Sequence, residues 1–317
     1  MERYNRLPKL EKSTKLYFTY DIDGYDIPCT MIRGNREGKR ILISGQIHAG
    51  EYPATPAIIK LAKELRPEDV SGEIIFMPCV NTSGFWAGTN ATVAEDGGNL
   101  NKVYPGDNTT ASGKIAQAFI NDIFKGVDFI LDLHAGGIDE MLTPCLFFPV
   151  EPTVRKASLE VAKYIDIPYV LSSFSKVGEF SYASNVLGIP ALLLERGCAG
   201  FCRKSDWLAY IEDMKDVLGR LGAIERSATL KKHLIYEKVY YEIFRRSGLW
   251  YPCDELKVDA LLKGGTVLGH TEDFAGNLLD EYRMREDGRI FYYRYGLNGT
   301  KDHSVVAYGL ESSCHDF

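Results

Sequence analysis

The sequence lacks an apolar run of the length that a membrane span needs. A spanning helix takes about 18 or more consecutive apolar residues, and the apolar runs of this 317-residue chain are far shorter. The first residues, Met-Glu-Arg-Tyr-Asn-Arg-Leu-Pro, place no apolar stretch behind a basic one. We therefore expect no secretory leader, no membrane partner and a cytoplasmic location.

Basic blocks and paired cysteines are also scarce. The formal net charge is -6, and a mildly acidic chain without lysine- or arginine-rich blocks repels a phosphate backbone, which excludes nucleic acid as an expected partner.

The seven cysteines are odd in number and scattered. This pattern predicts reduced thiols rather than a disulfide framework. Cys198 and Cys202 lie close together, but a single pair is weak support for a metal site.

Short buried strands alternate with amphipathic helices over the first two thirds of the chain. This alternation predicts an α/β fold in which a mainly parallel mixed sheet is flanked by helices, and ligands of such sheets bind at the carboxyl ends of the strands. Residues 81–109, rich in Asn, Gly and Thr, are expected to form a long loop. The expected strands are 40–45, 73–78, 127–133, 146–149 and 190–194, and the expected helices are 52–65, 111–124, 154–165, 178–187 and 205–223, the last capped by Ser205.

The pattern changes at about residue 235. Helical periodicity fades there, and glycine, tyrosine and short alternating runs take over, as in Arg289-Ile290-Phe291-Tyr292-Tyr293. These features predict a small β-rich C-terminal domain over residues 235–317, after a catalytic domain over residues 1–234.

Two of the six histidines follow buried strands directly. His48 opens the segment His48-Ala49-Gly50-Glu51, and His134 closes the strand Phe129–Leu133. Two histidines and one glutamate, with a fourth position left for water, form a recurrent catalytic zinc set. We therefore predict one Zn²⁺ per chain on His48, Glu51 and His134. The alternative is a glutamate that starts a helix beside a hydrogen-bonded histidine.

Glu195 ends the apolar run 190–194. An ionised carboxylate behind such a strand is costly unless it lies at the sheet edge or is paired. One interpretation is a salt bridge with Arg196. The other is a general base that takes a proton from a metal-activated water and returns it to a leaving amine. Asp132 shares a strand face with His134 and is expected either to orient that ligand or to be structural.

Four segments in this order resemble one family. They are His48-Ala49-Gly50-Glu51, Asn99-Leu100-Asn101-Lys102 with Tyr104-Pro105-Gly106, Asp132-Leu133-His134, and Gly188-Ile189-Pro190-Ala191 through Glu195. The chain is similar to the succinylglutamate desuccinylase/aspartoacylase group of the zinc carboxypeptidase superfamily over about residues 40–200, and more loosely at 263–269. The resemblance implies a zinc-carboxypeptidase-like fold, zinc on the three ligands above, Glu195 as base and acid, and cleavage of amide bonds.

Two departures from that family concern the substrate. The motif usually reads Asn-Leu-Asn-Arg, with the arginine on a substrate carboxylate, whereas this chain has Lys102, which keeps the charge but loses the planar fork of donors. The family's earlier loop arginine is also absent, because Gly88-Thr89-Asn90-Ala91-Thr92 contains none. Asn90, Asn101 and Lys102 are the candidate substrate-binding residues.

These observations predict a zinc-dependent hydrolase that deacylates a small N-acyl amino acid or a related amide. A carboxypeptidase-type metallopeptidase is the first alternative, since Lys102 suits the carboxylate at a peptide end. A metal-binding module without turnover is the second, because both arginines are missing. The sequence leaves a homo-oligomer open.

Overall fold

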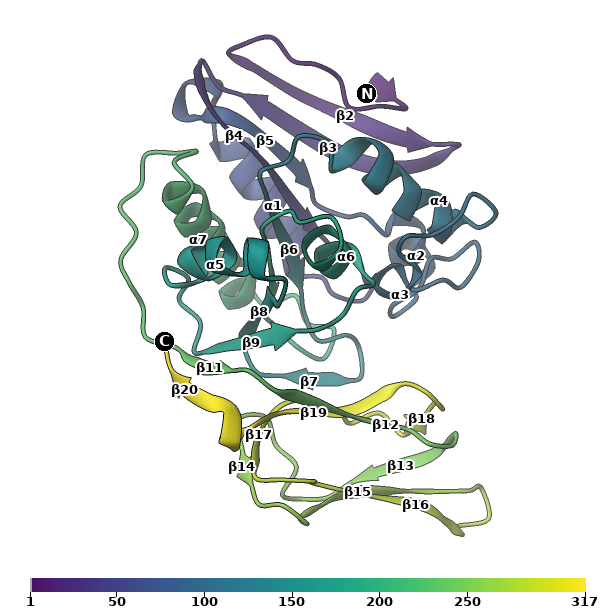
Figure 1. Cartoon of the computed structure of the whole chain (residues 1–317). Coiled ribbons are helices and arrows are strands. Elements are labelled where there is room, and N and C mark those ends of the chain that lie inside the picture. Colours follow the sequence, from purple (N-terminus) through teal and green to yellow (C-terminus); the bar gives the residue numbers. More distant parts are fainter. Residues whose placement is uncertain (1) are drawn as a thin grey trace.

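The computed structural model describes residues 2–317 and is built around one large mixed sheet (Figure 1). This sheet has eleven strands in the order β1-β2-β3-β5-β4-β6-β10-β8-β9-β11-β20. Six of its ten neighbouring pairs are parallel, which confirms the predicted mainly parallel mixed sheet. The strands are β1 (Glu2–Tyr4), β2 (Thr14–Ile22), β3 (Tyr25–Arg33), β4 (Arg36–Gly45), β5 (Ser71–Met77), β6 (Phe129–His134), β8 (Cys145–Pro149), β9 (Tyr169–Ser173), β10 (Ala191–Glu195), β11 (Leu234–Tyr236) and β20 (Cys314–Asp316).

Helices cover both faces of this sheet, because side chains of its strands alternate between two apolar clusters. On β4, Ile41 and Ile43 belong to one cluster and Leu42 to the other. The first cluster also holds side chains of α1 (Ala54–Glu64), α5 (Pro152–Ala162) and α7 (Lys204–Arg220). The second holds side chains of α3 (Leu100–Val103), α4 (Ala111–Ala118) and α6 (Glu179–Asn185). Within residues 2–317, none of the helices has the length and apolarity to cross a bilayer.

Three local expectations need correction. The expected loop 81–109 contains two short helices, α2 (Thr82–Ala87) and α3, each started by an asparagine side chain that accepts a backbone N–H. The expected helix 111–124 ends as α4 at Ala118 and continues as a π-helix, η2 (Phe119–Ile123). Ser205 does not cap α7, which begins one residue earlier after Arg203 and has no side-chain cap.

The last part of the chain is β-rich, as expected. One five-stranded sheet has the order β12-β19-β17-β14, with β7 paired to β17, and a four-stranded sheet has the order β16-β15-β13-β18. Aromatic side chains, among them Phe244, Trp250 and Tyr308, form the core between them. The strands are β7 (Glu140–Leu142), β12 (Val239–Ile243), β13 (Gly248–Pro252), β14 (Leu261–Leu262), β15 (Val267–Glu272), β16 (Leu278–Arg283), β17 (Gly288–Arg294), β18 (Asn298–Gly299) and β19 (Ser304–Leu310); the 3₁₀ turns are η1 (Pro67–Asp69) and η3 (Glu311–Ser313).

Strands exchanged between the two parts join them closely (Figure 1). The segment β7, which follows His134, pairs with β17 of the C-terminal part, and the last strand β20 returns to the large sheet beside β11. Arg294 of β17 also reaches the segment after β6, where it pairs with Asp139 at 2.6 Å and with Glu140, the first residue of β7, at 2.7 Å. A division at residue 234 stays a prediction, but the C-terminal sheets clearly lie against the segment that follows His134.

Candidate active site

The loop that carries His48 and Glu51 follows the carboxyl end of β4 and is tightly held. Gln46 has a left-handed backbone, with φ of 55°, and its side chain donates to the carbonyl of Ala49 at 2.8 Å and accepts from Thr55. Gly50 donates to the carbonyl of Asn90 at 2.6 Å, and a Cβ on Gly50 would lie only 2.7 Å from Asn90 Oδ1. The backbone of the loop therefore leaves the side chains at 48 and 51 little freedom.

His48, Glu51 and His134 meet at the ends of β4 and β6, which are parallel neighbours in the sheet. Their candidate ligand atoms all lie within 4.8 Å of one another. Glu51 lies between the two imidazoles, with Oε1 2.6 Å from His48 Nδ1 and Oε2 3.0 Å from His134 Nδ1. The exposed fraction of the side chain is 17% for His48, 6% for Glu51 and 1% for His134. The sequence prediction that these three side chains come together agrees with this geometry.

The electrostatics of this cluster favour a cation. Burial works against the ionised form of Glu51, but His48 and His134 outweigh it and lower its pKa to about 2. Burial likewise opposes a charge on His134, yet Asp132 and Glu51 raise its pKa well above the usual value. An ionised carboxylate flanked by two imidazole nitrogens is a donor set that suits zinc. The three residues therefore fit a single divalent metal ion.

An oxygen atom faces the outer nitrogen of each imidazole. Asp132 Oδ1 lies 3.2 Å from His134 Nε2, and Asn99 Oδ1 lies 3.2 Å from His48 Nε2. Contacts of this kind set the ring orientation of metal-binding histidines, and here they leave both Nδ1 atoms facing Glu51. Sequence reasoning anticipated Asp132 but missed Asn99, although Asn99 opens the motif Asn99-Leu100-Asn101-Lys102.

Glu195 lies directly beside the cluster because of strand register. β10 runs parallel to β6, with Glu195 opposite His134. Burial, followed by the charge of Glu51, raises the pKa of Glu195 well above its usual value. Its Oε2 is buried and has no hydrogen-bond partner within residues 2–317. The alternative salt bridge with Arg196 is wrong, since that guanidinium binds Asp213 at 3.0 Å.

The three candidate substrate residues have different environments. Asn90 Oδ1 accepts from the backbone N–H of Ile138 at 2.9 Å and its Nδ2 donates to Asp139 at 3.3 Å, so both ends of this amide are used by the fold. Asn101 packs on Gly178, where a Cβ would lie 2.3 Å from Asn101 Oδ1. Lys102 is exposed and forms no ion pair with the described residues. Of the three, Lys102 retains a charge that no described side chain of residues 2–317 neutralises.

A second carboxyl group is buried behind the cluster. Glu179, at the start of α6, has no exposed surface and accepts a hydrogen bond from Ser44. Burial, followed by the charge of Asp132, raises the pKa of Glu179 well above its usual value. Glu179 is thus neutral in the folded protein over a pH range in which it would ionise in the unfolded chain.

This shift predicts a pH dependence of stability. A carboxyl group whose pKa is raised in the folded state binds more protons there than in the unfolded state. Its contribution to the free energy of unfolding is therefore fully present below the unfolded pKa of about 4.5, and it is lost as pH rises through the folded pKa. We expect Glu179→Gln, which mimics the neutral form, to flatten the fall in the free energy of unfolding of the metal-free protein above that pH. Urea titrations at several pH values would measure it, with exposed Glu95→Gln as control. An unchanged pH slope in Glu179→Gln would contradict the assignment.

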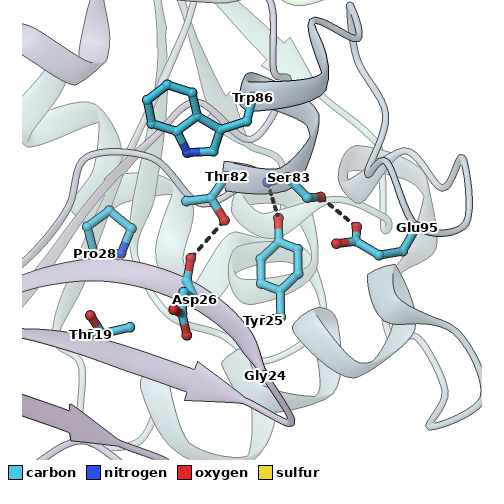
Figure 2. Close-up of a pocket in the computed structure, with 9 residues that line it drawn as sticks. All are labelled: Thr19, Gly24, Tyr25, Asp26, Pro28, Thr82, Ser83, Trp86 and Glu95. Carbon is cyan, nitrogen blue, oxygen red and sulfur yellow. Dashed lines mark hydrogen bonds between the residues drawn. The ribbon is translucent and has the colours of Figure 1, made fainter.

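A separate pocket lies between the β2–β3 hairpin and α2 (Figure 2). It measures about 430 Å³, and its lining residues include Tyr25, Asp26, Trp86 and Glu95. Its polar side chains already have partners, since Asp26 pairs with Arg3 at 2.6 Å and Glu95 accepts from Ser83 at 2.6 Å. None of its lining residues belongs to the cluster of His48, Glu51 and His134.

The model of the succinylglutamate desuccinylase/aspartoacylase catalytic domain matches residues 37–217, more than half of the chain. The chain belongs to the succinylglutamate desuccinylase/aspartoacylase family. The resemblance in the four motifs is thereby confirmed, and the matched segment contains the metal cluster and Glu195.

The chain is also similar to individual proteins and solved structures. The N-alpha-acetyl-L-2,4-diaminobutyric acid deacetylase of Halomonas elongata is 36% identical over 151 residues, which are 47% of this chain and 44% of that protein, so the match spans less than half of the relative's length. The product-bound structure of the ectoine utilization protein EutE (DoeB) from Ruegeria pomeroyi has a TM-score of 0.82 at 22% identity, covering 96% of this chain and 98% of that one. A succinylglutamate desuccinylase/aspartoacylase structure from Rhodobacter sphaeroides has a TM-score of 0.76 at 25% identity, covering 92% and 90%. The C-terminal β sheets are therefore part of the shared fold.

Proposed function

We propose that this protein is a zinc-dependent amidohydrolase that removes the acyl group from a small N-acyl amino acid. The observation that supports this most directly is the position of Glu195, in register with His134 and with a buried oxygen that has no hydrogen-bond partner within residues 2–317. A donor set for one divalent ion and a carboxylate beside it are the two parts that hydrolysis of an amide by water requires.

Each group has a distinct role in this proposal. His48, Glu51 and His134 would hold the metal, which when bound supplies a Lewis acid for the carbonyl and lowers the pKa of a water. Glu195 accepts the proton of the attacking water and transfers it to the departing amine. Its pKa is raised by burial, followed by the charge of Glu51, and a carboxylate with a raised pKa is the stronger proton acceptor. Asn99 holds the His48 ring in orientation by a hydrogen bond, and the charge of Asp132 lies 3.2 Å from His134 Nε2.

The substrate class rests on charge. Lys102 carries a cation without a protein partner among residues 2–317, and we assign it to the carboxylate of the amino acid. The Halomonas elongata relative is named for N-alpha-acetyl-L-2,4-diaminobutyric acid, an N-acyl amino acid that offers such a carboxylate. We propose this compound as the first substrate to test.

A hydrolysis panel with the zinc-loaded protein tests the proposal. We expect release of acetate and free amine from N-alpha-acetyl-2,4-diaminobutyrate, measured by amine detection, at rates at least tenfold above those for dipeptides. Faster cleavage of the peptides would favour the carboxypeptidase-type alternative. No turnover of any amide or ester, with metal content confirmed by elemental analysis, would favour the metal-binding module. Elemental analysis of the protein as purified, before zinc is added, would identify the ion.

A further inference from the structure

Amide hydrolysis places negative charge on the carbonyl oxygen, and enzymes meet that charge with donors already in position. The described cations around Glu195 are already engaged. Arg196 is bound to Asp213, and Arg294 is bound to both Asp139 and Glu140. The amide of Asn90 is used by Ile138 and Asp139. Lys102 is already assigned to the carboxylate of the substrate, so none of these side chains is left to donate to the carbonyl oxygen.

Strand β12 of the C-terminal part presents such a donor. Alternation along this strand sends Tyr240 and Glu242 toward the C-terminal core. The ring of Tyr240 stacks on Tyr308 with centroids 5.8 Å apart, and Glu242 is buried with Arg285 at 2.9 Å. Tyr241, between them, points the opposite way.

That opposite face of β12 is turned toward the large sheet. Val239, on the same side as Tyr241, packs with the apolar cluster that includes Cys145 of β8. Cys145 in turn is the antiparallel partner of Glu195. The register of two sheets thus brings Tyr241 to the side of the proposed base.

The hydroxyl of Tyr241 is available as a donor. It has no hydrogen-bond partner among residues 2–317, and the residue keeps 45% of its surface exposed although Cys145 and Glu195 lie close to it. Desolvation of the hydroxyl itself, followed by Cys145 and Glu195, raises the pKa of this phenol. The group therefore stays protonated at neutral pH, which a hydrogen-bond donor requires.

We propose that Tyr241, a residue of the C-terminal sheet, donates a hydrogen bond to the carbonyl oxygen of the scissile amide and is a catalytic residue of the reaction. This inference rests on the proposed amidohydrolase function and assigns the C-terminal sheet a chemical role in it. The phenol keeps its proton throughout, and it stabilises the charge that grows on the oxygen as water adds.

Tyr241→Phe tests the role, because it removes the hydroxyl and keeps the ring. Loss of one such donor typically costs a factor of about 100 or more in kcat, so we expect a fall of that size in kcat with KM changed less than about threefold. Tyr240→Phe is the matched control, since its hydroxyl contacts Arg285 on the other face of the strand, and it should keep wild-type kcat. Metal content and thermal unfolding, measured for both variants, detect a merely structural effect.

Ligand binding gives a second readout that packing alone would not move. Calorimetry on the zinc-loaded protein would compare a methylphosphonamidate analogue of N-alpha-acetyl-2,4-diaminobutyrate, which imitates the tetrahedral state, with acetate. We expect Tyr241→Phe to weaken binding of the analogue by a factor similar to the fall in kcat, and to leave the affinity for acetate nearly unchanged. Wild-type kcat in Tyr241→Phe, or an effect confined to KM, overturns the role of Tyr241 alone. A wild-type protein that neither hydrolyses the amide nor binds the analogue overturns the proposed function, and this inference with it.

Discussion

Glu195→Gln is expected to lower kcat by about a thousandfold while the protein keeps its metal, since positioned acid–base groups typically contribute factors of 10² to 10⁴. Glutamine retains the shape of the side chain and a carbonyl oxygen, but it can neither accept the proton of water nor return it to the amine. Steady-state kinetics would measure the fall in kcat, and elemental analysis would measure the zinc that the variant retains.

The pH profile adds an independent check on Glu195. Hydrolysis needs its ionised form, and its raised pKa moves that ionisation above the ordinary value of about 4.5. We expect kcat/KM of the wild-type protein to fall as pH drops through this higher value, and the same limb to be absent from the residual rate of Glu195→Gln. Exposed Glu95→Gln is the control and should behave as the wild type. Full activity of zinc-loaded Glu195→Gln would reject Glu195 as the base.

Removing a metal ligand should have the other large effect. His134→Ala deletes the most deeply buried nitrogen of the cluster and leaves Glu51 and Asp132 as buried carboxylates without their common partner. Loss of a residue that merely orients a ligand typically costs 10- to 100-fold in metal affinity, so we expect loss of the ligand itself to weaken zinc binding by more than about 100-fold. Hydrolysis should disappear in parallel.

Competition with a chromogenic chelator would measure the affinity. His270→Ala serves as control, because His270 lies on β15, pairs only with Glu272 among the described salt bridges, and belongs to no metal cluster of residues 2–317. A chelator should likewise abolish wild-type activity, and added zinc should restore it. Unchanged zinc affinity in His134→Ala would mean that the ion is held elsewhere.

The loop residues near the site show where sequence reasoning reaches its limit. Asn90 was a candidate substrate residue because it occupies the stretch where the family usually has an arginine. In the structure the backbone carbonyl of Asn90 instead accepts from Gly50 of the His48 loop, and its side-chain amide binds Ile138 and Asp139 of the segment after β6. The sequence gives the residue type at each position. The hydrogen-bond partners of a polar side chain, however, come from segments that are brought together only by the fold.

The sequence by itself determined the alternation of strands and helices, the β-rich end of the chain and the identity of the metal cluster. Those features are local, because hydrophobic periodicity and a polar residue at a strand end can be read within a few positions. The orientation of His48 by Asn99, the commitment of Asn90 and the approach of Tyr241 to Glu195 were decided by tertiary structure. Each depends on the register and packing of segments far apart in the chain, and neither periodicity nor residue type encodes which of them will meet.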